Sequence, residues 1–284
     1  MLECVVNVSE GRDPGILAEL SAAAGDPLLD VHADTIHNRS VFTLAAHDAA
    51  AVDESVHALA KRAIELVDLR RHEGIHPRLG VVDVVPFVPL GQPLGLGDDL
   101  DLSEALGARA RFVTWFAARG VPCFEYGPER SLPEVRRRAF RDLSPSAGPD
   151  HPHETAGACC VGARQVLVAY NVVLTSGVDT AKAIASVLRG PALRVLGLDL
   201  GGAGQVSFNL VAPLVVGPAE AYDLVATRAG IASAELVGLL PLAVLRRIPA
   251  ERWTQLALAE TTTIESRLAG ASGGSRDEAS AELS

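Results

Sequence analysis

The sequence contains 284 residues, of which 48% are hydrophobic and 21% charged, with a formal net charge of -10. This length allows one large domain or two smaller ones, each with its own core. The acidic charge argues against broad nucleic-acid binding, which needs a basic surface to replace the counterions of the phosphates. The apolar runs are short and interrupted by polar residues, so no membrane span is expected and a cytoplasmic location is predicted.

The cysteines and lysines indicate which kinds of covalent, metal and anion-binding sites to expect. The four cysteines show no C-x-x-C spacing, which predicts buried thiols rather than a disulfide framework or a structural zinc site. Only two lysines occur, Lys61 and Lys182, so a pocket for an anionic ligand must take its positive charge from arginine.

The N-terminal part predicts the element order β-α-β-β-α-β. Asp13 and Pro14 suit the N-cap and the first position of a helix, Gly25 ends that helix, and Asp48 caps a second, longer one. Strands are predicted from alternating or continuous apolar residues. The expected segments are strand 3–8, helix 14–24, strand 28–32, strand 40–46, helix 50–69 and strand 79–89.

The rest of the chain predicts further elements and then the same order again. A helix over 103–118, a strand over 121–126 and a short helix over 133–140 come first. The second β-α-β-β-α-β run consists of strand 166–174, helix 178–188, strand 193–200, strand 205–211, helix 218–230 and strand 234–240, and helices 241–247 and 251–268 follow it.

These patterns predict an α/β (α+β) fold with two subdomains, each a split β-α-β type sheet with helices packed on it. The predicted subdomains are residues 1–150 and 151–270, and residues 271–284 have the composition of a disordered tail. The glycine-rich segment 197–204 lies in a strand-to-strand turn. A Rossmann or P-loop site, which needs a following helix, is therefore not expected.

The stretch Arg71 to Gly80 carries more chemistry than any other. It contains the pattern H-E-x-x-H of zinc peptidases, which works only on a continuous helix. A glycine lies inside the pattern, and Pro77 pushes the residue before it into an extended conformation. A zinc hydrolase using His72 and His76, with His32 as a third ligand, therefore stays a less favoured alternative, and no metal is predicted.

Two interpretations of His76 are open on the residues alone. It can belong to a charged, solvated helix end, since Arg70 and Arg71 suit the C-terminus of the preceding helix. It can also be a general base or acid, because Pro77 fixes it at the mouth of an apolar strand and an imidazole has a pKa of roughly 6.5.

With these elements in order, the chain resembles the glutamate formiminotransferases, the transferase half of formiminotransferase-cyclodeaminase. The matches are collinear and run from residue 3 to about residue 268. They are Glu3-Cys4-Val5-Val6-Asn7-Val8-Ser9-Glu10-Gly11, Leu29-Asp30-Val31, Asn38-Arg39-Ser40-Val41, the stretch Arg71 to Gly80 with Asp83-Val84 and Pro86-Phe87-Val88-Pro89, Gly162-Ala163-Arg164, Gln205-Val206-Ser207 with Asn209-Leu210, and Leu236 to Leu242.

The resemblance implies an enzyme that transfers a formimino group from N-formimino-L-glutamate to N5 of tetrahydrofolate, a reaction of histidine degradation and one-carbon metabolism. It implies a cytoplasmic homodimer that binds tetrahydrofolate, as co-substrate, between its two subdomains. It implies neither a nucleic acid nor a membrane as partner.

The same resemblance assigns the site residues. His76 matches the family's catalytic histidine and is expected to act as general base and then as acid. Arg78 and Arg39, with Asn38, are expected to bind the donor, because arginine pairs with carboxylates in a bidentate way. His32 is also expected at the catalytic site, where it stands in the place of the family's catalytic aspartate. This replacement motivates the alternative of a relative that binds folate or another anionic ligand without transfer. The expected folate-binding residues are Gly148, Arg164, Asn171, Arg194, Gly197 and Gln205.

Overall fold

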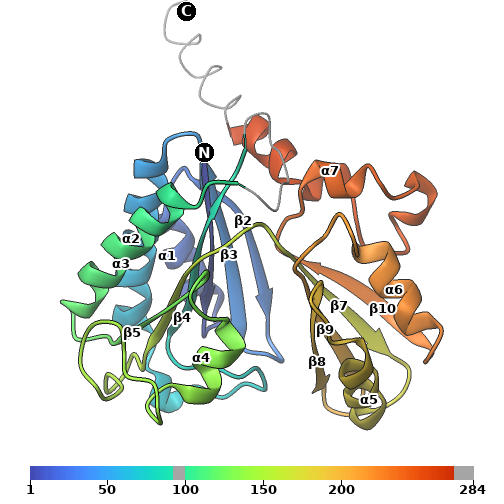
Figure 1. The fold of residues 1–284 in the computed structure, drawn as a ribbon, viewed down its shortest axis with the longest axis horizontal. Coiled ribbons are helices and arrows are strands. Elements are labelled where there is room, and N and C mark those ends of the chain that lie inside the picture. Colours follow the sequence, from blue (N-terminus) through green and yellow to red (C-terminus); the bar gives the residue numbers. More distant parts are fainter. Residues whose placement is uncertain (92–99, 272–284) are drawn as a thin grey trace, which may run out of the picture. The chain divides into compact units, whose positions relative to one another are not determined.

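The computed structural model describes residues 1–91 and 100–271, and these residues divide into two compact units (Figure 1). The first unit ends at Gln165 and the second begins at Val166. This division lies later in the chain than the boundary expected at residue 150, because a strand formed by residues 159–163 pairs within the first sheet.

The N-terminal half of the first unit has the predicted order. Asp13 caps the first helix with its side chain, which accepts hydrogen bonds from the amides of Gly15 and Ile16, and Asp48 caps the second through Ala50. The elements are β1 (Leu2–Val8), α1 (Pro14–Ala24), β2 (Leu28–Asp34), β3 (Arg39–Ala46), α2 (Ala49–Leu66), the single 3-10 turn η1 (Leu69–Arg71) and β4 (Val82–Pro89).

The first sheet has six strands in the order β2-β3-β1-β4-β6-β5. Each neighbouring pair among its first four strands is antiparallel, as a split β-α-β unit requires. β6 (Cys159–Ala163) and β5 (Cys123–Tyr126) extend it in parallel. β6 was not predicted, because all five of its small residues are buried and a short buried parallel strand lacks the alternation that marks a half-exposed one.

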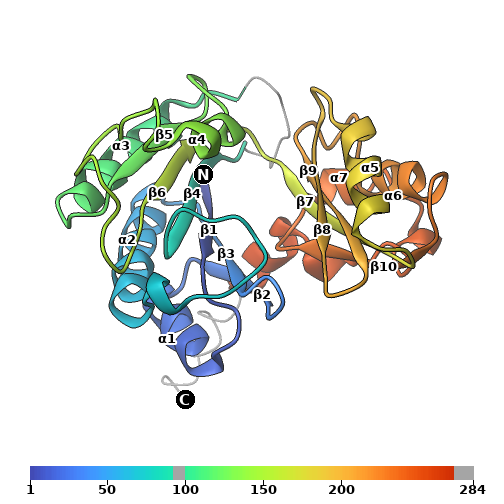
Figure 2. The same ribbon diagram turned by 90° about the horizontal axis from the view of Figure 1, so that it is seen from below.

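Helices cover one whole face of this sheet. α1, α2 and α3 (Ser103–Ala117) lie side by side along it in Figure 2. Leu2, Cys4 and Val6 of β1 point into the core beneath them, and all three are fully buried. The short helix α4 (Leu132–Arg138) packs near β5 on the opposite face, where Val135 joins a small cluster with Val84 and Phe124. On β1, β2 and β3 that opposite face carries polar side chains such as Asn7, His32 and Arg39 between apolar ones such as Val5 and Val41.

The second unit confirms the predicted repeat of element order. Its four antiparallel strands have the order β10-β7-β9-β8, and α5 and α6 pack on one face of the sheet. The elements are β7 (Val168–Leu174), α5 (Val178–Leu188), β8 (Leu193–Asp199), β9 (Gly204–Leu210), α6 (Pro218–Ala226), β10 (Ile231–Val237) and the short helix α7 (Leu242–Leu245).

One predicted helix is wrong. Residues 251–268 form the 3-10 turns η2 (Ala250–Arg252) and η3 (Glu260–Thr262) and a helix over 264–271 instead of one continuous helix. Ala257 has a φ of 54°, a left-handed conformation that a helix cannot contain. Apart from its first residue, the predicted tail 271–284 lies outside the described residues.

Two expectations from composition can be compared with the described residues. All four cysteines are buried and free, as predicted. None of the helices in residues 1–91 and 100–271 is long and apolar enough to cross a membrane.

Candidate active site

The segment that carries H-E-x-x-H is an irregular loop. η1 ends at Arg71, and residues 72–79 have no helical turn. Nε2 of His72 lies 2.8 Å from the carbonyl oxygen of Asn38 and so is engaged by the backbone. The helical arrangement that a zinc peptidase needs is therefore not formed. The described residues also contain no group of three or more His, Cys, Asp or Glu that could hold a metal ion.

The side chain of Arg78 fixes the conformation of this loop through hydrogen bonds to its backbone. Its Nη1 donates to the carbonyl oxygens of Gly74 and His76 at 3.0 and 3.2 Å, and its Nη2 donates to that of His72 at 3.0 Å. One guanidinium thus holds three carbonyls of a segment that has no secondary structure of its own. The side chain predicted to bind a substrate carboxylate is used in this structure to shape the loop around His76.

The loop is also fixed to the turn between β2 and β3. Asn38 has a φ of 47°, and its side-chain amide donates to the carbonyl of Glu73 at 2.9 Å while its Oδ1 accepts from the amide of Gly11 at 3.0 Å. A Cβ at Gly74 would lie 2.3 Å from the carbonyl oxygen of His37, so only glycine allows this approach. Asn38 therefore joins three segments rather than facing solvent.

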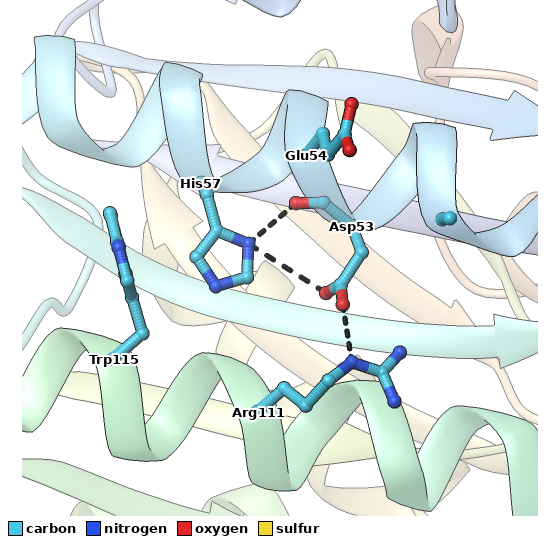
Figure 3. A pocket seen from close by; sticks show the side chains of 6 residues that line it. Asp53, Glu54, His57, Arg111 and Trp115 are labelled. Carbon is cyan, nitrogen blue, oxygen red and sulfur yellow. Dashed lines mark hydrogen bonds and ion pairs between the residues drawn. The ribbon is translucent and has the colours of Figure 1, made fainter.

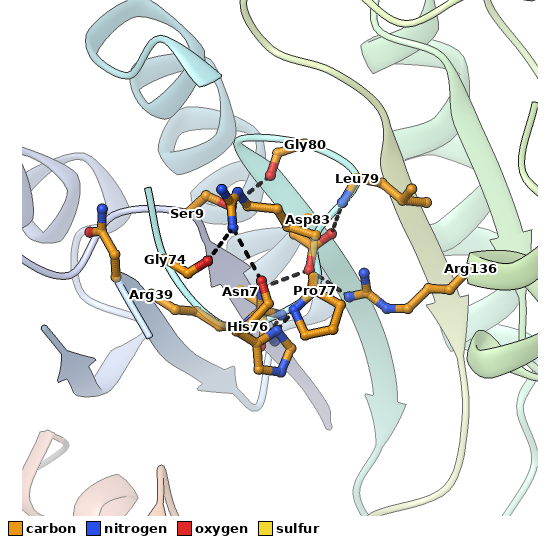
Figure 4. Close-up of polar contacts among 12 residues, drawn as sticks. Asn7, Ser9, Arg39, Gly74, His76, Pro77, Leu79, Gly80, Asp83 and Arg136 are labelled. Carbon is orange, nitrogen blue, oxygen red and sulfur yellow. Dashed lines mark hydrogen bonds and ion pairs between the residues drawn. The ribbon is translucent and has the colours of Figure 1, made fainter. Parts of the chain in front are cut away.

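His76 is half-buried, and its tautomer follows from its hydrogen bond (Figure 4). Nδ1 lies 2.8 Å from the carbonyl oxygen of Pro77, which can only accept, so Nδ1 carries the proton and Nε2 presents a lone pair. The ring of His37 meets that of His76 edge-on, with the centroids 5.8 Å apart. His37 was not singled out from the sequence, because a buried histidine in a turn has no local signal.

The environment keeps His76 neutral. Burial is the main cause that lowers its pKa to about 3, and the charge of Arg39 adds to the effect. Asp83 opposes it, and Arg136 lowers the pKa further. In the free protein the ring is thus unprotonated at Nε2 at neutral pH.

Beside His76 lies a buried cluster of one carboxylate and two guanidiniums (Figure 4). Oδ2 of Asp83 accepts from Nη1 of Arg39 at 2.7 Å and from Nη2 of Arg136 at 2.5 Å. Its Oδ1 accepts from the amide of Leu79 at 2.7 Å. Arg39 also donates twice to Oδ1 of Asn7, at 2.8 and 3.2 Å.

A β-bulge presents Asp83 to this cluster. Asn7 pairs with Val84 and Val8 with Val82, so Asp83 is the extra residue and has no partner on β1. A bulge re-aims a side chain and often lies beside a functional site. Regular alternation would place Asp83 on the helix-covered face with Val85.

The two arginines control the ionisation of Asp83. Burial alone raises the pKa of a carboxyl group, but Arg39 and Arg136 outweigh it and hold the pKa of Asp83 well below its ordinary value. Asp83 is fully buried, so this carboxylate keeps its charge only with its partners. Asp83 and Arg136 were not among the predicted site residues.

His32 lies on the polar face of the same sheet. It pairs with Val41, which pairs in turn with Asn7, and residues directly opposite each other project to the same face. Arg39 is two residues from Val41 along β3 and shares that face. The sheet thus brings His32, Asn7 and Arg39, from three strands, to one surface.

The predicted folate-binding residues fall in both units. Gly148 and Arg164 belong to the first. In the second, Asn171 pairs with Ser207, and Arg194 pairs with Asn209, which puts these side chains and Gln205 on one face of the sheet. Gly197 is different. A Cβ there would lie 2.4 Å from the amide nitrogen of Lys182, so this glycine permits α5 to pack closely on β8.

A separate pocket of ≈ 510 Å³ lies between α2 and α3, on the helix-covered side of the first sheet (Figure 3). Nε of Arg111 donates to Oδ2 of Asp53 at 2.5 Å, and the ring of His57 meets that of Trp115 with centroids 4.4 Å apart. These side chains face one another across the two helices, so their contacts stabilise the helix pair. No pattern along the chain predicts this pocket.

The comparisons with known proteins agree with the resemblance found in the sequence. The sequence model of the formiminotransferase domain, N-terminal subdomain, matches residues 1–164. The chain belongs to this family of formiminotransferases.

The relatives of the chain extend this match into the second unit. A glutamate formimidoyltransferase of Streptococcus pyogenes is 36% identical over 238 residues, 74% of this chain and 77% of the relative. One of Thermoplasma acidophilum is 34% identical over 275 residues, 85% and 88% of the two chains. The formimidoyltransferase-cyclodeaminase of Sus scrofa is 30% identical over 86% of this chain, which corresponds to 51% of that longer protein.

Proposed function

We propose that this protein is a glutamate formimidoyltransferase that moves the formimino group of N-formimino-L-glutamate to N5 of tetrahydrofolate. The observation that carries the proposal is the 34% identity to a named glutamate formimidoyltransferase across 85% of the chain, which includes residues of both units. Tetrahydrofolate is the proposed co-substrate, and the residues that the resemblance assigns to folate keep that role as a proposal. A homodimer is the proposed assembly, and light scattering tests it.

In the proposed reaction His76 moves one proton. The lone pair of N5 attacks the formimino carbon, and a new N5–carbon bond forms. N5 then loses its proton to Nε2 of His76, because the one hydrogen bond of this ring among the described residues is made by Nδ1. As the bond between that carbon and the glutamate nitrogen breaks, the imidazolium returns the proton to the departing amine, so free glutamate leaves and the histidine is neutral again.

The proposed roles of the neighbouring residues follow from their contacts. Arg78 and Asn38 hold the loop that presents His76, and Arg39 completes the charged cluster behind it. His32, on the same sheet face as Arg39, is proposed to contact the transferred group in place of a carboxylate.

The first test mixes the purified protein with tetrahydrofolate and N-formimino-L-glutamate and follows the methenyl folate by absorbance after acid cyclisation. His76→Ala is expected to lower turnover by about 10²- to 10⁴-fold, the usual worth of a general acid–base. His47→Ala, at an exposed histidine, is the matched control. Tetrahydrofolate binding with no turnover by the wild-type protein would favour the diverged binding relative that His32 suggests.

A further inference from the structure

The three arginines around His76 differ in how their donors are used. Arg78 is committed to three carbonyls, and Arg39 donates to both Asn7 and Asp83. Arg136 makes one hydrogen bond among the described residues, from Nη2 to Oδ2 of Asp83. Its side chain is 19% exposed, against 10% for Arg39. The remaining N–H groups of Arg136 are therefore available to a ligand.

The charge of the cluster is not balanced. Asp83 carries one negative charge, and the guanidiniums of Arg39 and Arg136 carry two positive charges. The two arginines share Oδ2 of Asp83 and its Oδ1 is taken by the amide of Leu79, so neither arginine forms a bidentate pair with this carboxylate. One positive charge of the cluster thus stands uncompensated in a largely buried setting, where the attraction between opposite charges is stronger than at the surface.

The shape of the Arg136 guanidinium favours a carboxylate as the anion. A guanidinium offers paired N–H groups whose spacing matches the two oxygens of a carboxylate. Arg136 comes from α4, whereas Asp83 and His76 come from β4 and the loop before it, and the Arg136 guanidinium lies beside Asp83 and close enough to His76 for its charge to act on the ring (Figure 4). A substrate that carries a carboxylate near the group to be transferred fits this arrangement.

We propose that Arg136 binds a carboxylate of the formimino donor, and that this carboxylate supplies the second negative charge that the cluster of Arg39, Asp83 and Arg136 lacks. The inference rests on the proposed function and names the residue that selects its donor. Because Arg39 and Arg136 both disfavour the protonated form of His76, a carboxylate that neutralises Arg136 makes the histidine a stronger base. Binding of the donor therefore raises the basicity of His76, whereas an amidine that lacks a carboxylate leaves it unchanged.

The kinetic test compares Arg136→Gln and Arg136→Lys with Arg137→Gln, a matched control at the exposed neighbouring arginine. Arg136→Gln is expected to raise KM for N-formimino-L-glutamate by on the order of ten- to a hundredfold, the worth of a charge-assisted hydrogen bond, and to leave KM for tetrahydrofolate within about twofold. Arg136→Lys should recover part of the loss. Equal effects on both KM values, or no effect on that of the donor, would overturn the proposal.

A second measurement does not need turnover. Free glutamate, the product that retains both carboxylates, is titrated into the protein while the His76 ring is followed by NMR. Glutamate is expected to move the titration midpoint of His76 upward in the wild type and in Arg137→Gln, and to leave it in place in Arg136→Gln. A wild-type protein that shows this response without transfer would refute the proposed function alone. Unchanged glutamate affinity in a folded Arg136→Gln protein would refute the carboxylate site alone.

Discussion

Replacing Asp83 by asparagine tests the central feature of the site. An asparagine side chain is nearly the same size as that of aspartate but neutral, so Arg39 and Arg136 would be left without their common counter-ion. Removing one partner of a buried ion pair typically costs about 3–5 kcal/mol, because the remaining charge stays buried and uncompensated. We expect Asp83→Asn to lower the free energy of unfolding of the first unit by this amount.

The two tryptophans make the measurement specific to one unit. Trp115 lies in α3 of the first unit and Trp253 in the second, so a Trp253→Phe background reports urea unfolding of the first unit by fluorescence. The matched control is Asp142→Asn. It removes an ion pair with Arg138, and the Asp142 side chain is 66% exposed. Such a surface pair is worth about 0–1 kcal/mol.

The difference between the two variants is the decisive result. If Asp83→Asn lowers the free energy of unfolding no more than Asp142→Asn does, the buried charges of Asp83, Arg39 and Arg136 stabilise the first unit no more than an exposed ion pair, and the expectation is refuted. The pH dependence gives a second check. The pKa of Asp83 is held below the value of about 3.9 of an unfolded chain, so its contribution is present above that pH and is lost as the pH falls below it. Asp83→Asn should remove this part of the acid sensitivity.

Three other residues give predictions of their own. Arg78→Lys should lower kcat by at least about tenfold with little change in the melting temperature, because an ammonium cannot reach three carbonyls at once; unchanged kcat would contradict its role in shaping the loop. In the free protein His76 should titrate near pH 3, as burial lowers its pKa to about 3, and an NMR midpoint near 6 would contradict this. Gly197→Ala should destabilise the second unit by about 1–3 kcal/mol in thermal unfolding, since its Cβ would lie 2.4 Å from the amide nitrogen of Lys182. The control Gly190→Ala has open space around its Cβ and should change the stability by less than about 1 kcal/mol.

The order of elements was predictable because its signals are local. The carboxylates of Asp13 and Asp48 cap helices within three residues of themselves, and the apolar alternation of the strands repeats every second residue. The helix predicted over 251–268 failed for the complementary reason. Its composition favours a helix, but the backbone conformation at Ala257 is fixed by packing of the surrounding turns.

Local patterns in the chain were enough to predict the two split β-α-β units and to draw attention to His76, since Pro77 and the surrounding charges are its neighbours in the sequence. What surrounds that histidine depends on the folded arrangement. Arg39 lies 44 residues from Asp83 and Arg136 lies 53 residues from it, and a bulge in β4 turns the carboxylate toward both. No periodicity encodes contacts at such separations, because they form only when the sheet register and the position of α4 are set together.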